Sequence, residues 1–187
     1  MYLDAALRAV LERDAADVVA WLRDLQVRFS GTAQAVELIT HRVKSERSIA
    51  QKLEAFPHLV VDTMQDIIGC RAVCVNGLGV RAVNREIVAH FGARVPRAPR
   101  ARRTELGYLS WHAVLEPVPG GPGYRTEIQV RTLTQHAWAR TSELLAYKKG
   151  DQADALMAEL RRLSRDLDEQ DRRIEDLFRQ AWPEGDR

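Results

Sequence analysis

Apolar residues recur near helical spacing through the first thirty positions of the chain. Between residues 2 and 29 they stand at Leu3, Leu7, Val10, Leu11, Val18, Leu22, Leu25 and Phe29. This period predicts a long amphipathic helix with one apolar stripe. Ser30-Gly31-Thr32 then predicts the end of that helix and the cap of a second helix over about residues 33–40.

Shorter elements alternate through the middle of the chain. Arg42-Val43-Lys44 predicts a short strand with Arg42 and Lys44 on one face. Ser45 is placed as the N-cap of a helix that runs to about Leu53. The segments that follow predict a helix over residues 62–68, a β-prone strand over 70–75 and a helix over 80–91.

A hairpin is expected in the second half of the chain. Residues 94–107 contain two prolines and five arginines with little periodicity, which predicts a loop. Segments 109–115 and 124–131 alternate and flank a Pro/Gly-rich connection, so they predict two antiparallel strands. A helix is expected over 133–148, and Gly150 is placed to end it.

The last expected helix, over about residues 152–181, carries a heptad seam. Steps of four and three alternate along Leu156, Leu160, Leu163, Leu167, Gln170, Ile174, Leu177 and Ala181. Packing on the rest of the chain and packing on another copy both predict this spacing.

Together the elements predict an α/β (α+β) fold, with a mixed, mostly antiparallel sheet flanked by helices and with long helices at both termini. We expect one domain over residues 1–150 and a C-terminal helical extension over 151–187 that serves oligomerisation.

The charge is unevenly distributed over the 187 residues. Residues 1–150 hold 21 basic and 15 acidic residues, a net charge of +6, whereas residues 151–187 hold 7 and 11, a net charge of −4. A basic body suits a protein that handles phosphates. The excess is too small for a dedicated nucleic-acid binder.

The sequence favours a cytoplasmic location. No segment approaches the roughly 18 apolar residues that a membrane span needs. Met1-Tyr2-Leu3-Asp4 lacks a basic region followed by an apolar run, so no signal peptide is expected. Cys70 and Cys74 are four apart, which is the wrong spacing for a two-cysteine metal knuckle and favours buried thiols in a reducing compartment.

Candidate chemistry gathers on the predicted hairpin. Alternation places Glu127, Gln129 and Arg131 on one face of their strand, and Ser110 and His112 share a face of the other. This face is either a site or the solvated side that antiparallel sheets commonly have.

Two further segments offer phosphate and metal chemistry. Four cations and a hydroxyl fall within eleven residues at Arg42, Lys44, Arg47, Ser48 and Lys52. A capped helix N-terminus among cations suits phosphate oxygens, although a charged helix surface gives the same pattern. Asp66 stands just before an apolar strand, where it is either a metal ligand or a simple cap.

In this order, five stretches resemble the synthetase domain of the RelA/SpoT family, specifically its single-domain small alarmone synthetases. They are His41-Arg42-Val43-Lys44 with Ser48-Ile49 and Lys52-Leu53; Met64-Gln65-Asp66-Ile67-Ile68-Gly69-Cys70-Arg71-Ala72-Val73; Gly107-Tyr108-Leu109-Ser110-Trp111-His112; Glu127-Ile128-Gln129-Val130-Arg131-Thr132; and Gln135-His136-Ala137-Trp138-Ala139. The resemblance implies a nucleotidyltransferase-like fold that moves the β,γ-pyrophosphate of ATP to the 3′-hydroxyl of GDP or GTP, with Mg²⁺ as cofactor.

The resemblance also implies roles on the donor side. Asp66 and Glu127 would coordinate magnesium, and Glu127 would also draw the proton from the attacking hydroxyl. Arg42 and Arg71 would sandwich the adenine of ATP with planar guanidinium groups, which lysine could not supply. The ATP phosphates would be held by Lys44, Ser48 and Lys52.

The resemblance implies further roles on the acceptor side, where the chain also departs from the family pattern. Tyr108 would stack on the acceptor base, with further acceptor and phosphate contacts from His112, Gln129 and Arg131. The chain departs from the family pattern at Arg103-Thr104-Glu105-Leu106, where many members have Pro-Lys-x-Asn and so a phosphate-binding lysine. It departs again at Arg140-Thr141-Ser142-Glu143, in place of Glu-x-Glu-His.

Three readings of the function therefore stand side by side. The first is synthesis of the guanine alarmone (p)ppGpp. The second is a toxin, neutralised by an antitoxin, that modifies an adenine nucleotide or the 3′ end of tRNA, which residues 94–103 would help to bind unless they form a mobile lid. The third is a catalytically degenerate regulatory module. Related small synthetases are often tetramers, so a homo-oligomer, tetramer or dimer, is expected.

Overall fold

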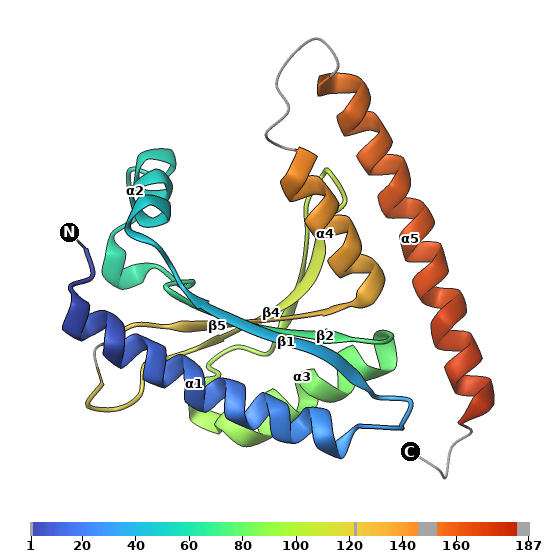
Figure 1. The fold of residues 1–187 in the computed structure, drawn as a ribbon, viewed down its shortest axis with the longest axis horizontal. Helices are drawn as coiled ribbons and strands as arrows, with labels where there is room; N and C mark the ends of the chain where they lie inside the picture. The colour runs from blue at the N-terminus through green and yellow to red at the C-terminus, as the bar shows by residue number, and fades with distance from the viewer. Residues whose placement is uncertain (1, 122, 146–152, 183–187) are drawn as a thin grey trace.

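One mixed sheet organises the computed structural model, which describes residues 2–121, 123–145 and 153–182 (Figure 1). Within these ranges five strands lie in the order β1-β2-β5-β4-β3. The strands are β1 (Val36–Val43), β2 (Ile68–Cys74), β3 (Arg100–Arg103), β4 (Leu109–Leu115) and β5 (Thr126–Thr132). All neighbours are antiparallel except β2 and β5, which are parallel. The prediction of a mixed, mostly antiparallel sheet is confirmed, and so is the β4–β5 hairpin.

Helices cover both faces of this sheet. They are α1 (Ala5–Arg28), α2 (Glu46–Ala55), α3 (Gly77–Phe91), α4 (Leu133–Leu145) and α5 (Ala153–Ala181), with two short 3₁₀ helices at Val61–Thr63 and Gly92–Arg94. Helices α1 and α3 lie along one face, α4 lies on the other, and α5 leans along α4 (Figure 1). Ser45 caps α2 as expected, because its hydroxyl accepts a hydrogen bond from the Ser48 N–H. No helix within the described ranges has the length and apolar character that a membrane crossing requires.

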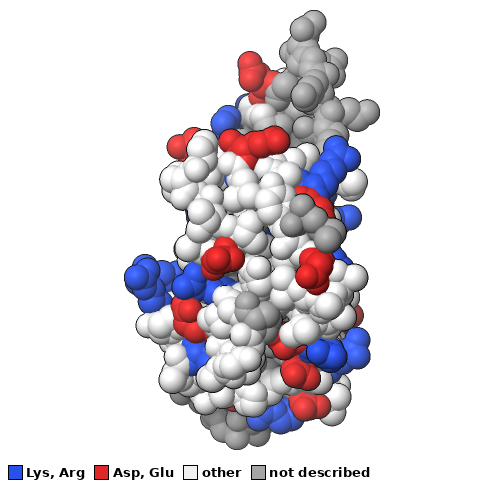
Figure 2. Space-filling view, turned by 90° about the vertical axis from the view of Figure 1, so that its left-hand side faces the viewer, with Lys and Arg blue, Asp and Glu red and all other residues white. Residues whose placement is uncertain are grey.

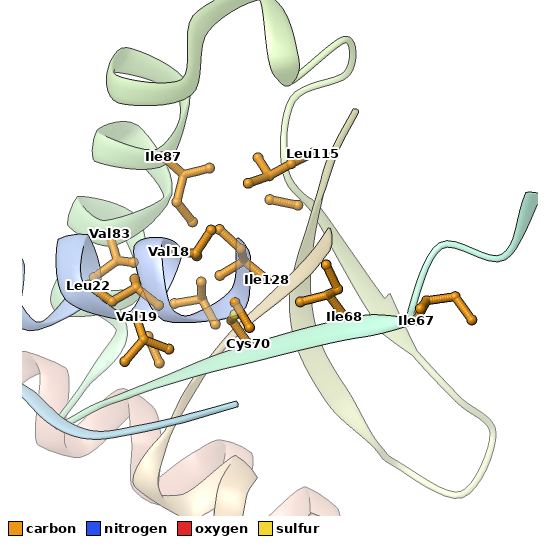
Figure 3. Close-up of a cluster of buried hydrophobic side chains, with 14 of the residues drawn as sticks. Val18, Val19, Leu22, Ile67, Ile68, Cys70, Val83, Ile87, Leu115 and Ile128 are labelled. Carbon is orange, nitrogen blue, oxygen red and sulfur yellow. The ribbon is translucent and has the colours of Figure 1, made fainter. Parts of the chain in front are cut away.

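The main core lies between the sheet and the α1–α3 layer. Leu22 and Val18 of α1 and Ile87 of α3 meet Ile128 of β5 and Cys70 of β2 there (Figure 3). Ile128 is fully buried, as its place on the apolar side of the alternating strand predicts. Burial raises the pKa of Cys70 to about 12 and makes it a poorly reactive thiol.

The helix expected over residues 33–40 is wrong, because residues 36–40 belong to β1 and residues 33–35 precede it. Val36 and Ile39 are three apart, which fits a helical period, whereas Val36 and Leu38 are two apart, which fits a strand. The β-branched residues pair with β2 instead, with Ile39 opposite Ala72 and Arg42 opposite Gly69. The strand expected at Arg42-Val43-Lys44 is thus the end of a longer one, and Lys44 lies just past it.

Two other sequence expectations are corrected. The helix over residues 62–68 is limited to the 3₁₀ turn Val61–Thr63, because Ile67 and Ile68 are buried and Ile68 already pairs in β2. The loop over residues 94–107 contains the strand β3. That strand has four exposed residues on the sheet edge, so no hydrophobic alternation reveals it.

The C-terminal helix is confirmed over Ala153–Ala181, but its seam does not pack as one stripe. Leu160 is buried, whereas Leu163 is 38% and Leu177 63% exposed. The buried positions of α5 include the polar Ser164, which contacts the loop before β4. Helix α4 is confirmed to Leu145, and the remaining part of that prediction, residues 146–148 and Gly150, lies outside the described residues.

Candidate active site

The sheet face opposite the main core is polar, and strand register gathers predicted site residues on it. Gly69 pairs with Glu127 and Arg71 with Gln129 across the parallel β2–β5 pair. His112 of β4 lies opposite Gln129 from the other side. Side chains at paired positions share a face, so Arg71, Glu127, Gln129 and His112 project together.

Glu127 is held by hydrogen-bonding side chains of the same sheet. Glu127 is 5% exposed. One carboxylate oxygen lies 2.7 Å from His112 Nδ1, and the other accepts a hydrogen bond of 2.8 Å from Gln129 Nε2. Burial raises the pKa of Glu127, but the bonds from His112 and Gln129 outweigh it and hold the pKa below its usual value. Glu127 is therefore a fixed carboxylate.

Asp66 has a different environment, in the turn that leads into β2. Its two oxygens accept hydrogen bonds of 2.7 Å from Lys44 Nζ and Lys52 Nζ. Burial raises the pKa of Asp66, but the bonds and charges of the two lysines outweigh it, so the pKa lies below its usual value. Ser48 lies on the first turn of α2, where its hydroxyl accepts a hydrogen bond of 2.9 Å from Ser45 Oγ.

Two arginines, Arg71 and Arg131, lie on the same polar face of the sheet as Glu127. Arg71 donates to Gln129 Oε1 at 3.2 Å. Arg131 is only 1% exposed, and neither its Nε nor its Nη2 has a partner among the described residues. Burial, then the nearby charge of Arg71, lowers the pKa of Arg131 to about 10. Buried donors without partners are uncommon, so this cation lacks an anion within the described protein.

Two cavities meet at Glu127. The smaller one, about 110 Å³, is lined by residues that include Arg42, Asp66, Arg71 and Glu127. The larger one, about 640 Å³, is lined by residues that include His112, Glu127 and a set of arginines, namely Arg97, Arg100, Arg102 and Arg125. Glu127 therefore stands between two spaces that differ in size and charge.

Tyr108 lies beside the larger cavity without being among its lining residues. It is half-buried, and its hydroxyl oxygen is 3.3 Å from His112 Nε2. Its ring packs at 6.4 Å from the ring of Trp138 on α4. Five of the predicted site residues are not among the lining residues of either cavity, namely Lys44, Ser48, Lys52, Tyr108 and Arg131. Lys44 and Lys52 still reach the smaller cavity through their hydrogen bonds to Asp66.

A family model for the region found in RelA/SpoT proteins matches residues 41–152. This chain belongs to the RelA/SpoT family. The match runs from the end of β1 through α4 and so includes every predicted site residue, which confirms the resemblance seen in the sequence.

Relatives of this RelA/SpoT family member include proteins of known and unknown role. The uncharacterized protein Rv1366 of Mycobacterium tuberculosis is 38% identical over 149 residues, covering 74% of this chain and 53% of that protein. The GTP pyrophosphokinase YjbM of Bacillus subtilis is 35% identical over 121 residues, covering 60% and 57%. The chain thus spans about half the length of the curated relatives it matches.

Solved structures confirm the fold. The crystal structure of small alarmone synthetase 1 from Bacillus subtilis superposes with a TM-score of 0.76 at 24% identity, covering 92% of this chain and 94% of that one. A second structure of that protein, bound to its product pppGpp, gives a TM-score of 0.73 at 25% identity, covering 90% and 92%.

The donor set of this RelA/SpoT family site fits magnesium. Asp66 and Glu127 line the same small cavity, and the charge of Asp66 raises the pKa of Glu127 slightly against the stronger lowering effects. Carboxylate oxygens are hard ligands, and Mg²⁺ typically takes one or two of them together with phosphate oxygens.

The sequence singles out the arginines of residues 94–103, but the loop expected there does not predict that Arg100 and Arg102 form a cationic wall of the larger cavity. Arg100 pairs opposite His112, and Arg102 Nη1 lies 3.8 Å from Glu127 Oε1. The alternation Arg100-Ala101-Arg102 is the signal that predicts both arginines on one face, once the segment is taken as a strand.

Elsewhere, basic and acidic side chains are interspersed on the described surface of the side that carries α2 (Figure 2). That side therefore lacks the one-sign field that nucleic-acid backbones favour.

Proposed function

We propose that this chain transfers the β,γ-pyrophosphate of ATP to the 3′-hydroxyl of GDP or GTP and so makes (p)ppGpp. The observation that carries the proposal is the position of Glu127 between two cavities, one with Asp66 and an arginine pair, the other with an arginine-rich wall. Two phosphate-rich substrates can react only where the spaces that bind them adjoin, and Glu127 lines both spaces. The names of the relatives support the same activity class.

The smaller cavity is proposed to take the donor. Arg42 and Arg71 both line it, and their planar guanidinium groups suit stacking on adenine. Lys44 and Lys52 both reach Asp66, so phosphates near Asp66 would lie within reach of two ammonium groups. Ser48 lies at the N-terminus of α2, which adds backbone N–H groups on the same side.

Asp66 and Glu127 are the residues that would hold magnesium. When bound, the ion would neutralise phosphate charge and polarise the transferred group. The remaining work of phosphoryl transfer is positioning and charge stabilisation, which the arginines and lysines of both cavities supply.

The larger cavity is proposed to take the acceptor. Its arginines offer guanidinium groups to the acceptor phosphates, and Arg100 and Arg102 would replace the lysine that the chain lacks near Arg103. Tyr108 would stack on the base, with His112 and Gln129 beside the ribose. Arg131 is proposed to act through its charge beneath the site, since its side chain is almost fully buried.

In the proposed reaction, Glu127 takes the proton of the attacking hydroxyl. Each carboxylate oxygen accepts one hydrogen bond in the structure and keeps a further lone pair. The 3′-oxygen forms a bond to the β-phosphorus of ATP while the bond from that phosphorus to the α–β bridging oxygen breaks, and AMP leaves. The low pKa of Glu127 keeps it ionised and ready near neutral pH.

The test is a transfer assay with ATP labelled at the β or γ phosphate, magnesium and one acceptor at a time. We expect label on GDP or GTP. Label on ADP, ATP or tRNA alone would overturn the guanine acceptor and favour the toxin reading. No transfer to any of them would overturn both enzymatic readings in favour of a regulatory module.

We also propose that α5 takes part in self-association. Leu163 and Leu177 are exposed on α5 and belong to its heptad seam. Light scattering of the wild-type protein and of Leu177→Glu tests this, and a monomer in both cases would overturn it.

A further inference from the structure

We propose that Ser164 of α5 is a positioning residue for the acceptor site. It acts through Gly107, which fixes the backbone from which Tyr108 reaches His112. The proposal rests on the proposed function, because it takes Tyr108 and His112 as acceptor-side residues. It concerns a helix that lies outside the sheet and that no predicted site residue belongs to.

The contact between α5 and the loop is direct and buried. Ser164 is 4% exposed, and its Oγ donates a hydrogen bond of 2.9 Å to the Gly107 carbonyl. Gly107 has a φ of +101°, a conformation that favours glycine. A Cβ at Gly107 would collide with Ser164 Oγ and Cβ. Helix α5 therefore packs directly on Gly107, and both the backbone conformation and the close contact restrict this position to glycine.

The loop transmits this contact to Tyr108. Thr104 N–H donates to the Tyr108 carbonyl at 3.0 Å, and the Tyr108 N–H donates to Thr104 Oγ1 at 3.2 Å. The Gly107 N–H donates to the Thr104 carbonyl at 2.9 Å. These bonds close residues 104–108 into a tight turn whose Gly107 carbonyl faces α5. A shift at Gly107 therefore moves the Tyr108 backbone with it.

Helix α5 also sets the wall against which the Tyr108 ring packs. Trp138 Nε1 donates a hydrogen bond of 2.8 Å to the Leu160 carbonyl, one turn before Ser164. The Asp168 carboxylate, one turn after Ser164, pairs with Arg103 Nη1 at 2.7 Å. Three successive turns of α5 thus contact Trp138, the loop at Gly107, and Arg103 at the end of β3.

The far end of this chain of contacts is the carboxylate at the boundary of the two cavities. Tyr108 Oη lies 3.3 Å from His112 Nε2, and His112 Nδ1 lies 2.7 Å from Glu127 Oε1. Loss of the Ser164 hydrogen bond would make the backbone at Tyr108 more mobile, and with it the contact between Tyr108 and His112. The donor residues on β1 and α2 make no contact in it, so the effect should fall on the acceptor.

The test compares Ser164→Ala, Ser164→Thr and a matched control, Glu175→Gln. The control weakens another anchor of α5, the 2.6 Å pair between Glu175 and Arg81, without touching the loop. The readouts are kcat, the KM values for GDP and ATP, and hydrogen exchange of the amides of residues 104–109. Because a single hydrogen bond is lost, we expect Ser164→Ala to raise the KM for GDP about three- to tenfold, with the KM for ATP changed less than about twofold.

Each outcome bears on the proposal. Faster exchange at residues 104–109 in Ser164→Ala, recovery in Ser164→Thr and a normal KM for GDP in Glu175→Gln support it. Equal shifts in both KM values, or the same shift in Glu175→Gln, assign Ser164 a general role in anchoring α5 and overturn it. An unchanged KM for GDP in Ser164→Ala overturns it while the proposed function stands. No transfer by the wild-type protein overturns the proposed function instead, and the exchange data then still decide whether Ser164 fixes the loop.

Discussion

Asp66 and Glu127 are two carboxylates on one cavity, but the protein holds them in opposite ways. Asp66 lies in a turn, and both of its partners are lysines from other elements. Glu127 lies within a central strand, and its closest partners are His112 and Gln129 on the same sheet. A turn with charged partners suits a group that shares an ion with phosphates. A strand whose neighbours hold the carboxylate by hydrogen bonds suits a group that must stay in one place, such as a proton acceptor.

The largest expected effect comes from Glu127→Gln. The amide keeps the shape and removes the charge, so we expect transfer to fall about 10³-fold or more while the fold remains, as general-base loss typically costs 10²–10⁴. Initial rates measure the loss, and circular dichroism with a thermal melt is the control. Activity within tenfold of the wild type would remove Glu127 from the role of base.

Compared with Glu127→Gln, Asp66→Asn is expected to lower the transfer rate less and the free energy of unfolding more. It leaves the buried Lys44, 8% exposed, without its carboxylate. We expect transfer to fall about 100-fold, since several groups share charge neutralisation. The free energy of unfolding should fall by about 2 kcal/mol, the scale for a buried charged group that loses its partner. Urea unfolding of both variants measures the contrast, and equal destabilisation of the two would contradict it.

Arg71→Lys tests whether the donor side depends on a planar guanidinium. Lysine keeps the charge and loses the flat face and the bond to Gln129. We expect the KM for ATP to rise about tenfold, the scale of a desolvated cation–π contact, with the KM for GDP little changed. Arg85→Lys on the exposed side of α3 is the matched control. A KM for ATP that stays at the wild-type value would rule out stacking by Arg71.

The smallest effect is a difference in acid stability. The folded protein holds the pKa values of Asp66 and Glu127 below their usual values. A lowered pKa contributes stability that is fully present above the usual carboxyl pKa, about 4, and is lost as pH falls through the folded value. Between pH 5 and 2 the wild type should therefore lose more stability than Asp66→Asn or Glu127→Gln. Urea unfolding across this range checks it, and parallel curves would argue against it.

Local patterns explain which parts of the fold could be predicted. The hairpin and its polar face follow from alternation, because a period of two fixes which side chains share a face. The pattern over residues 33–40 fits a helix or a strand, and only pairing with β2 decides between them. The edge strand β3 has no buried side to produce alternation. The division of the chain near residue 150 stays a prediction.

The sequence indicates the members of the candidate site better than their arrangement. Strand position and resemblance to the family both point to Asp66 and Glu127 as candidates, although the helix expected over residues 62–68 misplaces Asp66, which lies in a turn. The burial of Arg131 depends on packing over the sheet, which alternation within one strand does not reveal. The wall of Arg100 and Arg102 depends on the pairing of β3 with β4, and the alternation Arg100-Ala101-Arg102 becomes informative only once that pairing is known.

The parallel pairing of β2 with β5 has a consequence for how the site comes into being during synthesis. Arg71 and Gln129 are 58 positions apart in the chain, so this pairing is a long-range contact of the kind that forms slowly. As the chain leaves the ribosome from its N-terminus, β1 and β2 emerge with Asp66 and its lysines well before β5. A nascent chain that stops short of β5 therefore has the cationic half of the site and no Glu127. Catalytic competence would then arrive in one late step, with the strand that closes the middle of the sheet.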